Sequence, residues 1–182
     1  MEEKEWEVTA DQARKGDKDA FIRLYEQVYT DLYRFALYTL QRREDAEDVL
    51  GDTVMDAYIN IGKLRDAKAF RGWIFRILSN KCKKKIQEYQ ITRKQQMAEP
   101  DWEDAVDTQL GEKQLQQVLY RQDLQHALAQ LSEEERLIIS MTAVAGYTTK
   151  EVAHHLQKRH STVRSKYHRG LSKLRTYLEG KS

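Results

Sequence analysis

Apolar side chains recur at helical spacing through most of the sequence, and the strict alternation of a β-strand is scarce. In residues 17–40 the apolar positions follow one another every three or four residues, which places them on one broad face of a helix. The same period predicts further helices over residues 9–16, 41–61, 70–86, 114–131, 132–146, 148–156 and 161–178. The pattern therefore predicts an all-α protein.

Two of these helices begin at a recognisable cap. Ser132 with Glu135, and Thr148 with Glu151, have the spacing of a capping box, in which two side chains satisfy each other's backbone N–H groups. Ser161 is a cap candidate for the last helix. The caps agree with the helix starts that the apolar period predicts.

Charge divides the chain although its net charge is only +2. Residues 87–117 hold 3 basic and 7 acidic side chains and include the single proline, whereas residues 118–182 hold 11 basic and 6 acidic ones. We interpret residues 88–113 as a flexible acidic linker between two small helical bundles, residues 1–87 and 114–182. Of the two bundles, the second would attract nucleic acid by its net charge.

The helices predicted over 148–156 and 161–178 have the proportions of a helix-turn-helix, whose second helix lies in the major groove of DNA. Residues 161–175 carry five Lys or Arg side chains and no acid. The buried stripe of the second helix is predicted to be Val163, Tyr167, Leu171, Leu174 and Leu178. Its outward face and flanks carry Thr162, Arg164, Ser165, Lys166, Arg169 and Lys173. The alternative is a solvated helical hairpin, and Gln157 stands at a turn position where glycine is common.

A second basic surface is predicted in residues 76–85, which carry five basic side chains and no acid. Arg76, Ser79, Asn80 and Lys83 lie opposite the apolar side of that helix. A plain structural interpretation, in which lysines solvate a helix end, stays open beside a binding role.

An acidic stripe follows from Asp48, Asp52 and Asp56, which recur every four residues without lysines to pair with. Glu44, Asp45 and Glu47 lie in the first turn of that helix, where the macrodipole favours carboxylates. The stripe is either solvated or a docking surface for a basic partner.

Sequence motifs for catalysis and metal binding are absent, so we expect neither an enzyme nor a metal or cofactor. No glycine-rich phosphate loop, HExxH, CxxC or GxSxG occurs, and His154 and His155 are adjacent rather than one turn apart. Cys82, the single cysteine, lies among lysines that we expect to lower its pKa. The chain lacks a long apolar run, and its acidic start is unlike a signal peptide, which predicts a cytoplasmic protein without membrane insertion.

Taken together, these segments resemble the extracytoplasmic-function (ECF) sigma factors of bacteria. The likeness rests on DAEDVLGDTVMDAY and FRGWIFRILSNKCKKK in the first module, and on LSEEERLIISMTAVAGYTTKEVAHHL and STVRSKYHRGLSKLR in the second. It runs from about Ala20 to Leu178. Gly51 departs from the glutamine usual in the family, as do Gln157, Lys158 and Ser161 from the usual residues around the turn.

The resemblance implies three surfaces and three partners. Core RNA polymerase would bind Asp45, Glu47, Asp48, Asp52 and Asp56. The minus-ten promoter element would contact Lys63, Arg65, Arg71, Trp73, Arg76, Asn80, Lys83 and Lys84. The minus-thirty-five element would be read by Thr162, Arg164, Ser165, Lys166, Arg169 and Lys173. Family members are commonly held by an anti-sigma factor, often membrane-anchored, so we expect such a partner here.

A different class of protein also fits the second module. A helix-turn-helix regulator would bind duplex DNA without serving as a polymerase subunit. Against it, the first module has its own basic face and shows no sensor pocket. Transcription by core polymerase separates the two hypotheses, because a regulator cannot replace the sigma subunit.

Overall fold

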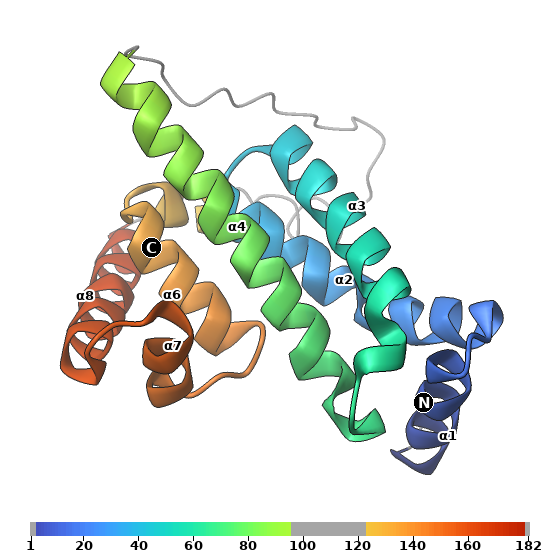
Figure 1. Cartoon of the computed structure of the whole chain (residues 1–182). Helices are drawn as coiled ribbons and strands as arrows, with labels where there is room; N and C mark the ends of the chain where they lie inside the picture. The colour runs from blue at the N-terminus through green and yellow to red at the C-terminus, as the bar shows by residue number, and fades with distance from the viewer. Residues whose placement is uncertain (1–2, 96–122, 181–182) are drawn as a thin grey trace, which may run out of the picture. The chain divides into compact units, whose positions relative to one another are not determined.

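A computed structural model of the chain describes residues 3–95 and 123–180. Within these ranges the structure is helical and contains no strand (Figure 1). The chain divides into two compact units, residues 1–92 and 93–182. The prediction of an all-α fold built from two helical bundles is therefore confirmed.

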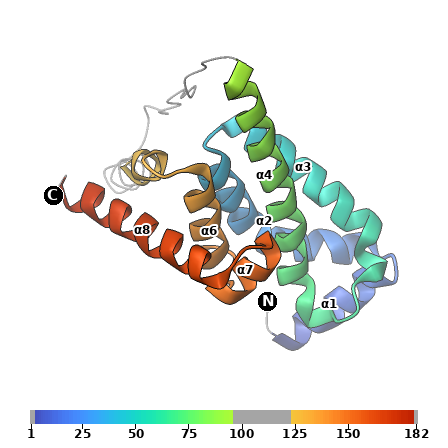
Figure 2. The same cartoon turned by 60° about the vertical axis from the view of Figure 1, so that its left-hand side comes forward.

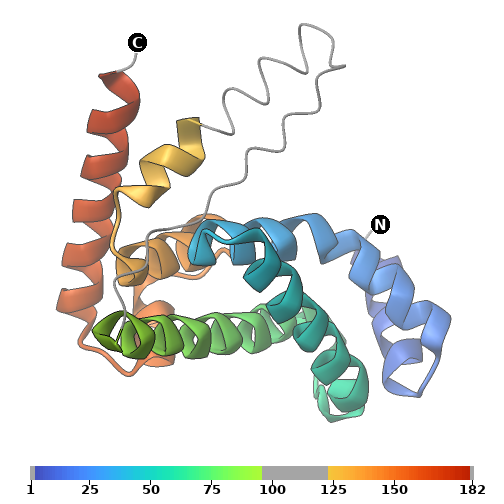
Figure 3. The ribbon, with the colours of Figure 1, turned by 90° about the horizontal axis from the view of Figure 1, so that it is seen from above.

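The first unit is built on a hairpin of two long helices, Lys18–Leu40 and Arg43–Asn60. Helix α1 is Glu3–Arg14, α2 is Lys18–Leu40, α3 is Arg43–Asn60 and α4 is Phe70–Gln95. Two short 3-10 turns, Ile61–Lys63 and Ala67–Ala69, connect α3 to α4. Helix α2 packs against both α1 and α3, and Figure 3 shows α3 and α4 lying beside it.

The connections of this hairpin are set by single residues. Gly16 takes a φ of +98°, and Asp17 then caps α2 by accepting a hydrogen bond from the Ala20 N–H at 3.0 Å. At the other end of α2, Gln41 takes a left-handed φ of 60° and its N–H reaches the Leu37 carbonyl. The chain therefore reverses within two residues and begins α3 at Arg43.

Aromatic rings from α2 and α4 form the core of the first unit. Phe35 and Phe75 meet edge to face with ring centroids 5.7 Å apart, and Phe21 and Phe70 do so at 6.3 Å. Phe35, Phe70 and Phe75 are fully buried. Because Phe→Ala in such a core costs about 3–5 kcal/mol, this cluster fixes α4 against the hairpin.

Cys82 also lies in this core, fully buried on the inner side of α4. Burial raises the pKa of its thiol, so the expectation of a lowered pKa is wrong. Ser79, which the sequence pattern placed on the outer face, is buried as well.

The second unit contains the predicted helix-turn-helix (Figure 2). Residues 123–129 are helical, α6 is Glu133–Ala143, α7 is Thr149–Leu156 and α8 is His160–Glu179. Both predicted capping boxes are present, at Ser132 and at Thr148. Gln157 takes a left-handed φ of 55° between α7 and α8, which is the conformation that glycine usually supplies.

Helix α8 packs differently from its predicted stripe. It begins at His160 after Arg159, without a side-chain cap, so the cap predicted at Ser161 is wrong. Only Val163 and Gly170 of α8 are buried, and Leu171 is 39% exposed. A Cβ at Gly170 would lie 2.7 Å from Ile139 Cδ1, which shows how closely α8 approaches α6.

The predicted linker begins too early. Helix α4 continues through Gln95, so residues 88–95 are helical rather than part of a flexible segment. The rest of the linker and the predicted helical start at 114–122 lie outside the described residues. The boundary at 113 stays a prediction.

Candidate functional site

The acidic stripe of α3 lies along the flank that faces α4. Lys85 Nζ is 2.7 Å from Asp45 Oδ1, and Lys81 Nζ is 2.6 Å from Asp56 Oδ2. The expectation that the stripe has no lysines to pair with is therefore wrong for Asp56, because its partner Lys81 comes from another helix. Glu47 lies on the opposite flank and pairs with Arg43 at 2.8 Å.

Asp45 has the least exposed carboxylate of these residues, with 17% of its side chain accessible. It accepts a hydrogen bond from the Tyr89 hydroxyl as well as its contact with Lys85. Burial raises the pKa of Asp45, but these two hydrogen bonds outweigh burial and leave the pKa below its usual range. The guanidinium of Arg42 covers the Tyr89 ring at 4.9 Å. Asp45 thus ties α3 to α4.

Asp48 and Asp52 are exposed and line a hollow of about 340 Å³ between α3 and α4. Its lining is Asp48, Val49, Asp52, Lys81, Lys84, Lys85 and Glu88. Carboxylates and ammonium groups therefore face each other across it. Met55 and Ile59, 60% and 69% exposed, add apolar surface to the same helix.

The basic face predicted on α4 is divided by these pairings. Lys81 and Lys85 turn toward α3, whereas Arg76, Asn80 and Lys84 are exposed and Lys83 is half-buried. In the connection before α4, Lys63 and Arg65 are exposed, and Lys63 donates to Asn60 Oδ1 at 2.6 Å.

Two other predicted DNA contacts also support the fold. Arg71 pairs with Asp31 at 2.9 Å and lies 5.0 Å from the centre of the Phe75 ring. Trp73 is partly exposed and packs on Phe70, with ring centroids 6.1 Å apart. Arg71 therefore anchors the first turn of α4 to α2.

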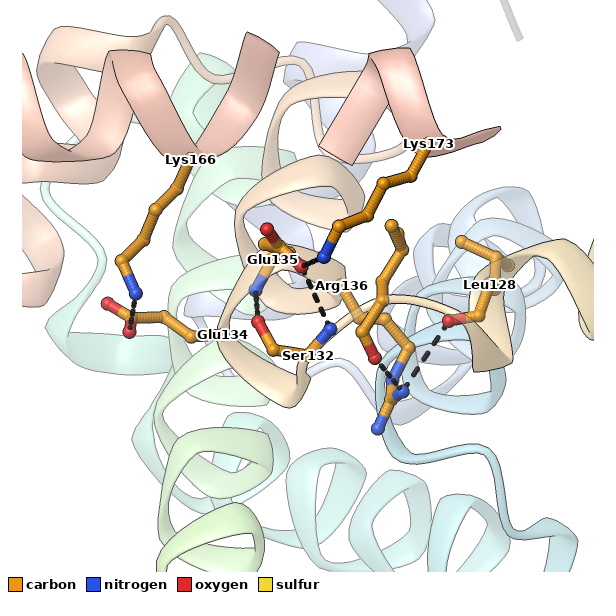
Figure 4. Close-up of polar contacts among 8 residues, drawn as sticks. Leu128, Ser132, Glu134, Glu135, Arg136, Lys166 and Lys173 are labelled. Atoms are coloured by element: carbon orange, nitrogen blue, oxygen red, sulfur yellow. Dashed lines mark hydrogen bonds and ion pairs between the residues drawn. The ribbon is translucent and has the colours of Figure 1, made fainter. Parts of the chain in front are cut away.

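Helix α8 presents Thr162, Arg164, Ser165 and Arg169 to solvent. Two predicted residues instead contact α6: Lys166 Nζ is 2.6 Å from Glu134 Oε2, and Lys173 Nζ is 2.9 Å from Glu135 Oε2 (Figure 4). Thr162, Ser165 and Arg169 share one side of α8, Arg164 lies on its far flank, and Lys166 and Lys173 lie toward α6.

The lysines that contact Glu134 and Glu135 favour the charged form of both carboxylates. Burial raises the pKa of Glu134, but hydrogen bonds from Lys158 and Lys166 outweigh it and lower the pKa overall. Burial likewise raises the pKa of Glu135, which Lys173 and the Ser132 capping contacts lower overall. Both carboxylates are therefore ionised at neutral pH.

No group of three or more His, Cys, Asp or Glu side chains in the described residues could hold a metal ion. Among the same residues, no helix is both long and apolar enough to span a membrane.

Comparisons with known proteins match both units. The family model "Sigma-70 region 2" matches residues 24–90, and "Sigma-70, region 4" matches residues 127–176. The ECF RNA polymerase sigma factor SigX of Bacillus subtilis is 26% identical over 166 residues, covering 89% of this chain and 85% of SigX. The chain belongs to the ECF sigma factors.

Further relatives agree with this family. The ECF sigma factor SigM of Mycobacterium tuberculosis is 27% identical over 163 residues, covering 90% of this chain and 79% of SigM. CnrH, solved in complex with the cytosolic domain of CnrY, has a TM-score of 0.62 at 22% identity and covers 98% of this chain and 99% of CnrH. RpoE of Bartonella quintana, solved with the anti-sigma factor NepR, has a TM-score of 0.66 at 22% identity, covering 90% and 98%. Both structures support the fold.

Several residues of this sigma factor were missed at the sequence level. Lys81 and Lys85 are spaced by four on α4, but the carboxylates that they meet, Asp56 and Asp45, are eleven residues apart, so no shared period pointed to these contacts. Glu134 and Lys158 gave no signal either, because the rest of α6 and the whole of α7 lie between them in the sequence.

Proposed function

We propose that this ECF sigma factor binds core RNA polymerase and directs initiation at specific promoters, acting in the cytoplasm by binding rather than by catalysis. The observation that carries the proposal is the pair of exposed cationic helical surfaces, on α4 and α8, within the segments that match regions 2 and 4. Two DNA-binding modules on one chain raise each other's effective concentration. Neither module then needs to bind tightly alone.

Region 2 would hold the melted minus-ten strand. Its proposed contacts are Lys63, Arg65, Arg76, Asn80, Lys83 and Lys84 with Trp73 beside them, while Arg71 supports the helix that carries them. Stacking on an aromatic ring contributes about 1–3 kcal/mol per base, and cationic side chains add sequence-independent affinity for phosphates. This combination suits single-stranded DNA.

Region 4 would read the minus-thirty-five duplex through Thr162, Arg164, Ser165 and Arg169, which α8 presents to solvent. Arginine and small hydroxyl side chains match the acceptor and donor pattern of base edges in the major groove. Lys166 and Lys173 are left out of this reading surface because they contact α6.

Polymerase would dock on α3. Asp48 and Asp52 are exposed there, and exposed Met55 and Ile59 lie on the same helix. A surface of carboxylates beside apolar side chains fits a basic partner that also buries some apolar area. Asp45 and Asp56 would take part while remaining tied to α4, and Glu47 would mark the edge of the contact.

An anti-sigma factor is a further proposed partner. RpoE was solved with the anti-sigma factor NepR, and CnrH with the cytosolic domain of CnrY. The same kind of protein, in some cases anchored to the membrane, would hold this chain inactive by covering its polymerase or DNA surfaces.

Transcription with purified components tests the proposal. The chain is added to bacterial core polymerase that lacks sigma, and transcripts are sequenced from a promoter library. We expect new start sites that share upstream elements. A chain that binds duplex DNA but neither joins polymerase nor starts a transcript would be a helix-turn-helix regulator, and the proposal would be wrong.

A further inference from the structure

Two lysines of region 4 contact one carboxylate, although 42% of the Lys158 side chain stays exposed to solvent. Lys158 Nζ lies 2.6 Å from Glu134 Oε1, and Lys166 Nζ lies 2.6 Å from Glu134 Oε2. Figure 4 shows Lys166 reaching across from α8 to Glu134. Each oxygen of Glu134 thus receives one ammonium group.

The three residues come from three parts of the helix-turn-helix region. Glu134 lies in the first turn of α6, Lys158 lies in the turn between α7 and α8, and Lys166 lies on α8. Side-chain exposure is 26% for Glu134 and 29% for Lys166, so this pair is partly shielded from solvent. The N-terminal end of α6 also favours the negative charge. Lifting both lysines away would leave a shielded carboxylate without its partners.

Lys158 stands in the turn that leads from α7 into α8. The contact with Glu134 gives the lysine a structural role there. Without Glu134, the side chains of Lys158 and Lys166, next to α8 and on it, would both be available to any DNA backbone. Phosphate contacts carry no sequence information and strengthen binding to every duplex.

We propose that Glu134 withholds Lys158 and Lys166 from DNA phosphates, which makes Glu134 a specificity-determining positioning residue of region 4. Exposed Arg164 and Arg169 then supply the cationic contacts of α8. Weak affinity for random DNA follows, so binding depends more on the base-reading side chains. The inference deepens the proposed function, since promoter selection needs discrimination against the surrounding DNA.

The salt dependence of binding to random-sequence duplex DNA tests this inference. The full chain is titrated against a fluorescently labelled random duplex at several salt concentrations. Each phosphate contact contributes about −0.9 to the slope of log K against log[salt]. We expect Glu134→Gln to steepen the slope by about 1.8, because two lysines are released. A fourfold rise in salt then costs this variant about ten times more affinity than it costs the wild type.

Single lysine variants keep the inference testable even if Glu134→Gln alters the fold. In the wild-type background, we expect Lys158→Gln and Lys166→Gln to leave the slope unchanged. In the Glu134→Gln background, each lysine substitution should make the slope of log K against log[salt] shallower again by about 0.9. Arg169→Ala is the positive comparison, since this exposed arginine should lose about one phosphate contact in either background.

Glu179→Gln is the matched control, because it removes one negative charge from α8 where the acid only meets Arg175 at 3.7 Å. A slope in Glu134→Gln equal to that of the wild type or of Glu179→Gln would overturn the inference. A flatter slope for Lys166→Gln alone would also overturn it, since Lys166 would then already contact DNA. Random-duplex binding needs no polymerase, so the transcription assay decides the proposed function separately.

Discussion

Asp45 and Asp52 lie on the same flank of α3 but in different surroundings. Asp45 is tied to Lys85 and Tyr89 and is largely shielded, whereas Asp52 is exposed beside Asp48. A basic partner can approach the exposed pair without dismantling the contact between α3 and α4. At the residue scale, we therefore assign different roles to two carboxylates that the family resemblance grouped together as polymerase contacts.

Charge reversal separates these roles. Asp48→Lys with Asp52→Lys should weaken binding to core polymerase by at least about tenfold, because two attractive charges become repulsive. The exposed side chains leave the core untouched, so the helical content should be unchanged. Binding is measured by titration with labelled core polymerase. Asp19→Lys with Glu26→Lys is the control, since it makes the same charge change on exposed positions of α2. Equal affinities for the two double variants would refute the docking surface.

At the scale of single elements, two helical glycines differ in their surroundings. A Cβ at Gly51 of α3 would meet nothing within 4 Å, while one at Gly170 of α8 would lie 2.7 Å from the buried Ile139 side chain. Glycine in a helix costs about 1 kcal/mol relative to alanine. Gly51→Ala should therefore gain about that amount, and Gly170→Ala should be less favourable than Gly51→Ala by roughly 1–3 kcal/mol because of overpacking.

Hydrogen exchange resolves the two substitutions within the full chain. Protection of α3 amides should rise in Gly51→Ala. In Gly170→Ala, protection of α6 and α8 amides should rise less than this or fall. In Gly51→Ala the second unit is the internal control, and in Gly170→Ala the first unit is. The same gain in both variants would mean that α8 does not need its close approach to α6.

The sequence predicted the helices better than it predicted their contacts. Caps at Ser132 and Thr148 are local features, and the structure confirms both. Helix α4 runs on through polar residues that lack an apolar period, so its end at Gln95 left no periodic signal. The inner line of α8 passes through Gly170, which has no side chain for a hydrophobic pattern to register.

At the candidate site too, the sequence predicted positions along each helix but not contacts between helices. Spacing placed the acids on α3 and the lysines on α4 correctly along each helix. It could not show that Asp45 meets Lys85 or that Glu134 meets Lys158, because such contacts depend on how the helices pack. Burial of Cys82 did follow from spacing, since it lies four residues after Leu78 and four before Ile86 on the buried side of α4, but the lysines beside it in sequence masked this pattern.

At the scale of the whole molecule, acid should loosen both units in the same range of pH. Asp45 in the first unit, and Glu134 and Glu135 in the second, all have a lowered pKa in the folded chain. A carboxylate of this kind contributes stability above its unfolded pKa, and this contribution is lost as the pH falls through the folded value. We expect stability to decline from about pH 4.5 downward.

Unfolding by urea at a series of pH values, followed by hydrogen exchange, measures this decline. Glu134→Gln with Glu135→Gln should flatten the profile of the second unit below about pH 4.5, since two titrating groups are removed. The first unit, with Asp45 intact, is the internal control. Parallel profiles for wild type and variant would show that these carboxylates do not govern the acid response.

The chain's one cysteine lies sealed in the core of its first unit, with a thiol whose pKa burial raises. Alkylating reagents should therefore reach Cys82 only when that unit opens, so the rate of alkylation reports how often the unit opens. A second cysteine introduced on the surface would react far sooner. Fluorescent dyes can thus be attached site by site to the native sequence, without first replacing the natural thiol.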